Sequence, residues 1–201
     1  MKKSIVLATL LAMGATSAFA SEPSNAWFGG LEAGNTSADF VIDGSSEDDS
    51  GASMSIKVGK YLGNAGRVYA LYTTYNTDDN VDLNSYGIGY DYIIYNSTNF
   101  KPFIGLNLGY FNYEASGLDA AAASYGLTSS SDSVDISGIT YGLNLGSMYE
   151  INKNFDIELG ARLIYNNADD TVTFSNGIGS ADIKGEIDNI IQFYVGVNYN
   201  F

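Results

Sequence analysis

Residues 193–201 read FYVGVNYNF, and this stretch decides the fold. Apolar or aromatic side chains stand at every second position, from Phe193 to Phe201, and most of the positions between them are small or polar. A period of two is typical of a β-strand whose two faces meet different surroundings. The stretch is therefore predicted to be a strand with one large apolar face.

The same alternation recurs along the chain. It predicts seven further strands, at residues 27–38, 52–61, 67–75, 86–94, 104–110, 138–146 and 155–163. In the stretch 67–75 we place Tyr69, Leu71 and Tyr75 on the large face. Short turns at 62–66, 96–101 and 150–154 alternate with longer polar connections at 40–51, 76–82, 114–134 and 166–185. This layout is typical of a bacterial outer-membrane barrel with turns on one side and loops on the other.

The composition of the two strand faces indicates which of them points outward. One face carries Leu, Ile, Tyr and Phe, and the other carries Gly, Ser, Asn and a few charges. Eight strands enclose a lumen that side chains just fill, so the larger face must point outward, against lipid. Lipid cannot satisfy backbone N–H and C=O groups, so the sheet must close. The sequence predicts an all-β fold, a closed antiparallel up-and-down transmembrane β-barrel of eight strands.

Aromatic side chains gather near the predicted strand ends. We expect one outward girdle near the short turns, comprising Trp27, Tyr61, Tyr69, Tyr92, Phe103, Tyr149, Phe155 and Tyr199. We expect a second near the loops, comprising Phe40, Tyr75, Tyr86, Tyr110, Tyr165 and Phe193. Two aromatic girdles around an aliphatic band match the two interfaces of a bilayer.

The N-terminal residues predict export. Lys2 and Lys3 precede the short apolar run 5–13, and Ala18-Phe19-Ala20 fits a small-x-small cleavage site. We predict a signal peptide at residues 1–20 and a barrel domain at residues 21–201. The sequence contains no Cys, so no disulfide supports the exported fold.

The last strand carries a resemblance to a known family. This strand ends in Phe201 after alternating aromatic residues. In this feature the chain is similar to the small eight-stranded outer-membrane barrels: the OmpA transmembrane domain, the OmpX/Ail family and the opacity-type porin family. The resemblance implies an integral protein of the Gram-negative outer membrane, in contact with its lipid. It also implies that Phe193, Tyr199 and Phe201 form the signal read by the barrel-assembly machinery.

Five charged residues fall on the predicted inward face: Glu32, Lys57, Asp91, Glu158 and Arg162. Buried charges are tolerated when they pair and their hydrogen bonds are met. One interpretation of this set is a gate or selectivity filter, and the other is a structural plug. We favour the plug because lumens of this size are usually filled by side chains.

Nothing in the sequence predicts catalysis or a cofactor. The chain has no His, on which the enzymes that resemble this fold depend. Without Lys2 and Lys3, seven basic residues face 23 acidic ones, which argues against nucleic acid as a partner. Divalent cations at the acidic loops are one further interpretation. Asp78, Asn80 and Asp82 have the spacing of a Ca²⁺ loop, but Leu83 replaces its Gly, so the match fails.

The sequence thus favours a non-enzymatic outer-membrane barrel that serves envelope structure or surface interaction. Two alternatives stay open: a narrow porin or channel for small solutes or apolar molecules, and an adhesin that acts through its long loops.

Overall fold

The computed structural model describes residues 26–42, 45–63, 66–76, 81–95, 98–116, 128–129, 133–175 and 180–201. Its strands are β1 (Trp27–Ile42), β2 (Ser45–Tyr61), β3 (Gly66–Asn76), β4 (Val81–Ile93), β5 (Phe100–Ser116), β6 (Thr128–Ser129), β7 (Ser133–Glu150), β8 (Phe155–Ser175) and β9 (Ser180–Asn200). No helix in the described part of the chain is long and apolar enough to cross a membrane. The predicted signal peptide lies outside the described residues and stays a prediction.

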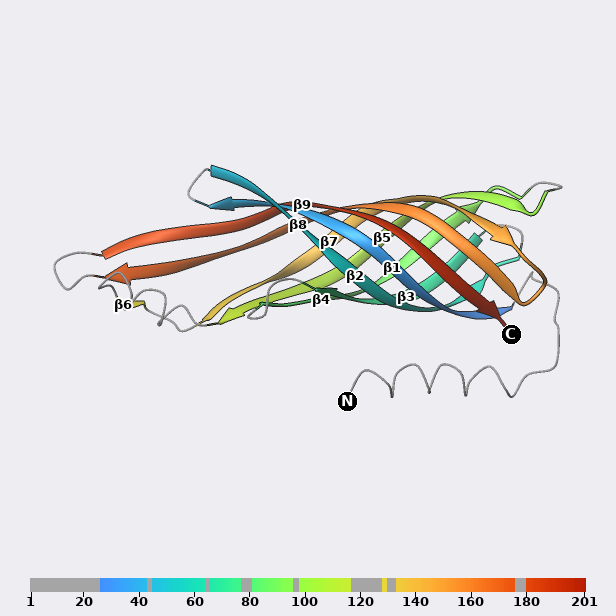
Figure 1. Ribbon diagram of the computed structural model, residues 1–201, viewed down its shortest axis with the longest axis horizontal. Coiled ribbons are helices and arrows are strands. Elements are labelled where there is room, and N and C mark those ends of the chain that lie inside the picture. Colours follow the sequence, from blue (N-terminus) through green and yellow to red (C-terminus); the bar gives the residue numbers. More distant parts are fainter. Residues whose placement is uncertain are drawn as a thin grey trace.

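The eight long strands form one closed ring. Each pairs with the next in an antiparallel ladder, in the order β1, β2, β3, β4, β5, β7, β8 and β9, and β9 returns to β1. Figure 1 shows the strands running obliquely around one elongated barrel. Backbone hydrogen bonds of 3.0 and 2.9 Å between Trp27 and Phe201 continue the closing seam to the end of the chain. The prediction of an eight-stranded closed antiparallel barrel is confirmed.

Tight turns join the strands at one end of the barrel. Leu62 N donates to Gly66 O at 2.8 Å, and Gly63 takes a positive φ of 57°, which Gly adopts without steric cost. In the turn before β8, the side-chain Oδ1 of Asn152 accepts bonds from the backbone N–H groups of Asn154 and Phe155. These turns set the hairpin registers, and a register slip of one residue would exchange the two faces of a strand.

The apolar face points outward around the ring. Ile88, Leu106 and Leu159 are each more than three-fifths exposed, although they lie at the middle of their apolar series. The alternate positions point into the lumen and are mostly buried. In a water-soluble protein this pattern would be inverted, whereas hydrocarbon favours it.

The predicted phase of β3 is wrong. Tyr69 and Tyr75 are buried and Leu71 is half-buried, whereas Val68, Ala70 and Tyr72 point outward. Both faces of this strand carry aromatic residues, so size does not decide its phase. The phase is decided by Arg67, a charge that lies on the face shared with Tyr69 and Tyr75 and is fully buried among lumen carboxylates.

Four residues that were predicted to belong to the outward girdles have buried side chains inside the barrel: Tyr61, Tyr69, Tyr75 and Phe103. Tyr61 and Phe103 have the parity of the inward positions on their own strands. Their rings fit the narrow lumen because glycine stands opposite some of them. A Cβ at Gly89 would collide with the Tyr69 ring, and a Cβ at Gly146 with the Phe103 ring. Most other girdle residues with described side chains point outward, including the stacked pair Tyr86–Tyr110 and Tyr165, which stacks on Tyr141.

Two of the predicted loops are largely strand. The connection expected at residues 40–51 is mostly paired as β1 and β2, and much of the connection at 166–185 is paired as β8 and β9. These segments are polar at most positions, so they lack the apolar alternation by which a lipid-facing strand is recognised. Beyond the apolar band, strands can pair through their backbones without an alternation of apolar and polar side chains.

A charge on the outer wall should destabilise the barrel. Leu106 lies at the centre of the outward series of β5, so Leu106→Arg should lower the free energy of unfolding by about 2–4 kcal/mol. Urea unfolding in lipid vesicles measures this. The control Asn99→Arg, at an exposed turn position, should have little effect, and equal losses in both variants would contradict the lipid-facing assignment.

Deleting Phe201 should impair assembly. The deletion removes its backbone bonds to Trp27 and the ring that stacks on Tyr199 at a centroid distance of 6.2 Å. We expect less folded, heat-modifiable protein in the outer membrane. Phe201→Tyr, which keeps the ring and the backbone, is the matched control. Undiminished assembly of the deletion variant would count against the terminal Phe as an assembly signal.

Candidate functional site

The lumen holds a connected set of buried charges, which we call the lumen network. It brings together the five residues selected from the sequence, and the structure adds Arg67 to them. They are Glu32 on β1, Lys57 on β2, Arg67 on β3, Asp91 on β4, and Glu158 and Arg162 on β8. All six are at most 2% exposed. Strand alternation delivers each of them to the lumen, and closure of the ring brings them into contact.

Lys57 lies at the centre of the network. Its Nζ is 2.7 Å from Oε1 of Glu32 and 2.8 Å from Oε2 of Glu158. The same ammonium lies 5.3 Å from the ring centroid of Tyr69, where the face of the ring attracts a cation. Lys57 therefore links β1, β2 and β8 across the lumen.

Arg67 links β3, β4 and β8. Its Nη2 lies 2.7 Å from Oδ2 of Asp91 and 2.8 Å from Oε1 of Glu158, and its Nε donates to Oδ2 of Asp91 at 2.8 Å. The guanidinium also lies over the ring of Phe103, 5.0 Å from its centroid. Arg67 is not among the lumen residues predicted from the sequence, because that prediction places β3 in the wrong phase. The signal available was the charge itself, which stands directly opposite Asp91 in the β3–β4 register.

Arg162 lies at the loop-side end of the network. Its Nη2 is 2.9 Å from Oε1 and 2.8 Å from Oε2 of Glu32, which lies on β1, across β9. Its Nη1 donates to Oε1 of Gln192 at 3.0 Å, and its guanidinium lies 4.0 Å from the ring centroid of Tyr194. Gln192 in turn donates to Oγ of Ser53 at 2.8 Å. Arg162 thus joins the charges to a row of neutral polar groups.

Neutral side chains occupy further lone pairs of the carboxylates. Tyr194 donates its hydroxyl to Oε1 of Glu158 at 2.9 Å, and Asn198 donates to Oε2 of Glu158 at the same distance. Asn144 donates to Oδ1 of Asp91 at 3.0 Å, and its own Oδ1 lies 3.1 Å from the Tyr194 hydroxyl. A buried ion pair is tolerated when such bonds complete it. The lumen network meets that condition for Glu158 and Asp91.

The network leaves little space around it. A Cβ at Gly160 would collide with the ring and hydroxyl of Tyr194, so the glycine makes room for an aromatic that crosses the lumen. A gap of about 30 Å³ lies beside Arg162, Tyr69 and Asn107. This volume holds about one or two water molecules, which is less than a hydrated ion occupies.

The described residues contain no group of three or more His, Cys, Asp or Glu placed to hold a metal ion. Asp78 and Asn80, two of the three residues with the spacing of a Ca²⁺ loop, lie outside the described residues. Divalent cations at the acidic loops therefore stay a prediction.

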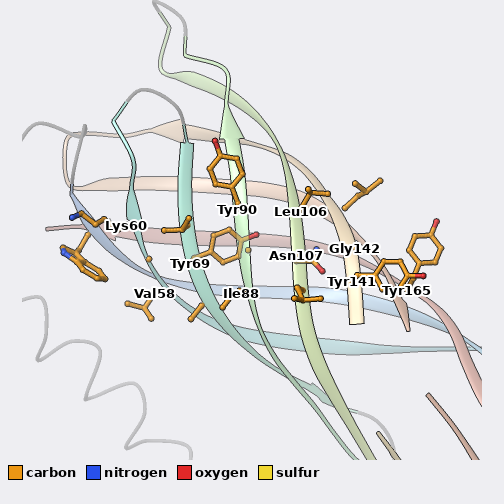
Figure 2. Close-up of a pocket in the computed structure, with 17 residues that line it drawn as sticks. Val58, Lys60, Tyr69, Ile88, Tyr90, Leu106, Asn107, Tyr141, Gly142 and Tyr165 are labelled. Carbon is orange, nitrogen blue, oxygen red and sulfur yellow. The ribbon is translucent and has the colours of Figure 1, made fainter. Parts of the chain in front are cut away.

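The outer wall carries an open depression that faces the bilayer (Figure 2). Outward side chains of β1 to β5, β7 and β8 line it, among them Val58, Ile88, Leu106 and Tyr141, and the inward residues between them contribute its floor. Lys60 lies at one end, with its Nζ 5.7 Å from the ring centroid of Trp27. The apolar lining is suited to lipid chains, and the Trp–Lys pair is suited to the headgroup region.

A family model decides the classification of this barrel. The model of the outer membrane protein beta-barrel domain matches residues 6–201. The chain belongs to this family. Its closed ring, outward apolar band and aromatic girdles are therefore those of an outer-membrane barrel. No curated protein matches the chain significantly.

Solved structures show the same fold. Neisserial surface protein A (NspA) is 18% identical, with 86% of this chain and 97% of that chain covered and a TM-score of 0.58. OprG from Pseudomonas aeruginosa is 14% identical, with 91% and 99% covered and a TM-score of 0.54. AlkL, solved in lipid bilayers, is 12% identical, with 92% and 94% covered and a TM-score of 0.51. At these identities the likeness shows the fold alone.

Removing Arg162 should be costly. Arg162→Ala leaves Glu32 with only Lys57, and breaking a buried pair costs about 3–5 kcal/mol of unfolding free energy. The double variant Arg162→Ala/Glu32→Ala should recover part of this loss, because Lys57 keeps Glu158 as its partner. The control Arg162→Ala/Glu150→Ala removes a carboxylate at the turn end and should recover nothing. Denaturant unfolding measures all four proteins, and equal stability of the two double variants would contradict the pairing.

Proposed function

We propose that this chain is a non-enzymatic outer-membrane barrel with a closed lumen, which serves envelope structure and holds its extended loop-side strands in place for surface interaction. The observation that carries the proposal is the lumen network. Six charges from five strands meet in the lumen and are paired with one another at 2.7–2.9 Å.

The burial of these charges favours a plug over a selectivity filter. A filter binds passing ions with charges that water reaches, and the binding must be weak enough for release. Here the side chains of Lys57, Arg67 and Glu158 have no exposed surface. An ion that entered the lumen network would have to break an existing ion pair. One charge of that pair would then remain buried without a partner.

The same pairing argues against catalysis. A general acid or base needs access to a substrate. Glu158 accepts bonds from Lys57, Arg67, Tyr194 and Asn198, so both of its oxygens are occupied. The chain also has no His to act as a base. Export by the signal peptide and insertion by the barrel-assembly machinery belong to the same proposal.

The unmodified protein should conduct ions poorly or not at all in a planar bilayer. Arg162→Ala should raise the leak current, because it removes a side chain that spans part of the lumen. Lys153→Ala, in an exposed turn, should behave as the unmodified barrel does. Steady, sizeable single-channel conductance from the unmodified protein would reject the plug and favour the channel.

A second candidate function is adhesion. It is favoured by the length of β8 and β9, 21 residues each, which continue past the Tyr141–Tyr165 pair of the loop-side girdle. The similar structure NspA is named a surface protein, which supports the same candidate. Shortening the β8–β9 hairpin should abolish binding to a host surface without affecting the lumen network.

A further inference from the structure

The open depression of the outer wall is a groove that runs across the strands, and we call it the wall groove (Figure 2). One row of outward side chains forms its turn-side edge. In this row each residue stands directly opposite the next in the strand ladders. The row consists of Trp27, Lys60, Val68, Tyr90, Leu106 and Leu143.

The next outward row, two residues further along each strand, forms the loop-side edge. It consists of Val58, Ala70, Ile88, Leu108, Tyr141 and Tyr165. The positions between the two rows point into the lumen, so the floor is largely backbone. Ala70 has the smallest side chain of both rows, so the loop-side edge is lowest at β3.

The wall groove rises from the turn side toward the loop side. Its turn-side row leaves β1 at Trp27, continues through Leu163 and Ile191, and returns to β1 at Ser37. Because β1 runs toward the loops, one circuit of the barrel climbs from residue 27 to residue 37 of this strand. Figure 2 accordingly shows Lys60 at one end of the groove and Tyr141 and Tyr165 at the other.

The length of the wall groove corresponds to one leaflet of the bilayer. From Lys60 on β2 to Tyr141 on β7 the groove crosses β3, β4 and β5, a path of about 19 Å at about 4.8 Å between strands. With strands tilted by about 40°, this path rises about 12 Å, which is half of the ~25 Å apolar band of such barrels. A lipid chain that starts at the turn-side interface would therefore reach the middle of the membrane along this path.

Lys60 gives the wall groove a charge at its turn-side end. Among the residues whose side chains the structure describes, it is the one charged residue at an outward strand position. It is half-buried, and its Nζ lies 5.7 Å from the ring centroid of Trp27. No carboxylate of the described part of the chain lies within ion-pair distance of this ammonium. Its charge therefore faces the headgroup region without a protein counter-ion.

We propose that the wall groove binds one anionic phospholipid of the periplasmic leaflet, with its phosphate at Lys60 and one acyl chain laid along the groove toward Tyr141. The short turns of outer-membrane barrels face the periplasm, so the headgroup end belongs to that leaflet. Lys is a point charge that binds phosphate, and Trp prefers the same interfacial depth. This site lies outside the lumen and goes beyond the proposed function.

The charge of the groove selects the headgroup. An amine or choline headgroup carries a cation as well as its phosphate, and the described outward positions offer no acid to pair with it. A headgroup with a net negative charge, such as phosphatidylglycerol, leaves no cation without a partner. One Lys near an anionic lipid surface contributes about 1 kcal/mol, which corresponds to about a fivefold preference.

Trp27 allows a direct test, because it is the only Trp of the chain and lies beside Lys60. The full-length barrel is reconstituted in phosphatidylcholine vesicles that contain a small fraction of brominated lipid, whose chain bromines quench Trp fluorescence on contact. Two probes are compared in the same protein, brominated phosphatidylglycerol and brominated phosphatidylcholine. We expect the phosphatidylglycerol probe to reach equal quenching at an about fivefold lower fraction.

Variants separate the charge from the shape of the groove. Lys60→Gln should quench equally with both probes, whereas Lys60→Arg should keep the preference. Lys153→Gln removes a Lys in an exposed turn outside the groove and should also keep it. Ala70→Phe fills the low point of the loop-side edge and should reduce the preference. The matched control is Ala33→Phe, at an exposed outward Ala of β1 that does not line the groove.

Three results would overturn the proposal: equal quenching by both probes in the unmodified protein, a preference that survives Lys60→Gln, or equal losses in Lys60→Gln and Lys153→Gln. The last result would indicate a general attraction of the turn side for anionic lipid. Concentrated NaCl should weaken the preference in the unmodified protein, which tests the charge contact without any substitution. The plug is tested separately by conductance, so failure of one proposal is distinguishable from failure of the other.

Discussion

Backbone hydrogen bonding in hydrocarbon is the constraint on which this structure depends. Each N–H and C=O group at membrane depth must find its partner in the chain, and an unsatisfied group costs several kcal/mol. The ring meets this demand only when β9, the last strand, pairs with β1, the first strand. This pairing removes both edges of the sheet. The short turns and the terminal strand are therefore as necessary to the fold as the apolar band.

Closure with eight strands determines what the lumen contains. The interior is too narrow for most large side chains, so it combines glycines with a few long polar residues that reach across. Lys57, Arg67 and Arg162 each contact a carboxylate on a different strand. These pairs also specify the register, because a slip of one residue would turn buried charges toward lipid. The lumen network thus requires the same faces of β1, β2, β3, β4 and β8 to point into the lumen together.

Beyond the apolar band the constraint relaxes, because water can satisfy an open strand edge. The wall stays closed as far as the Tyr141–Tyr165 pair and divides immediately beyond it. The bulges that bend β8, β9 and β1 lie at this same level. The membrane-spanning part is accordingly a sealed ring. On the loop side, β8, β9, β1 and β2 stay paired as one group, and β3, β4, β5 and β7 stay paired as another.

The sequence by itself determined the class of the protein, the number of strands and the outward face of most strands. It could do so because lipid imposes a period of two that is visible in the residues themselves, as in Ile88 and Leu106. It also indicated that Glu32, Lys57, Asp91, Glu158 and Arg162 share the lumen, because alternation assigns each of them a side. It failed at β3, where aromatics on both faces concealed the phase, and at the polar strand extensions, where no lipid imposes alternation.

Only the tertiary structure decided the pairing. That Arg162 meets Glu32 across β9, or that Arg67 bridges Asp91 and Glu158, depends on the stagger of all eight strands around the ring. The division between β7 and β8 likewise depends on bulges in neighbouring ladders, which no local pattern records. Period and composition act within one strand, whereas register and closure are properties of the whole ring.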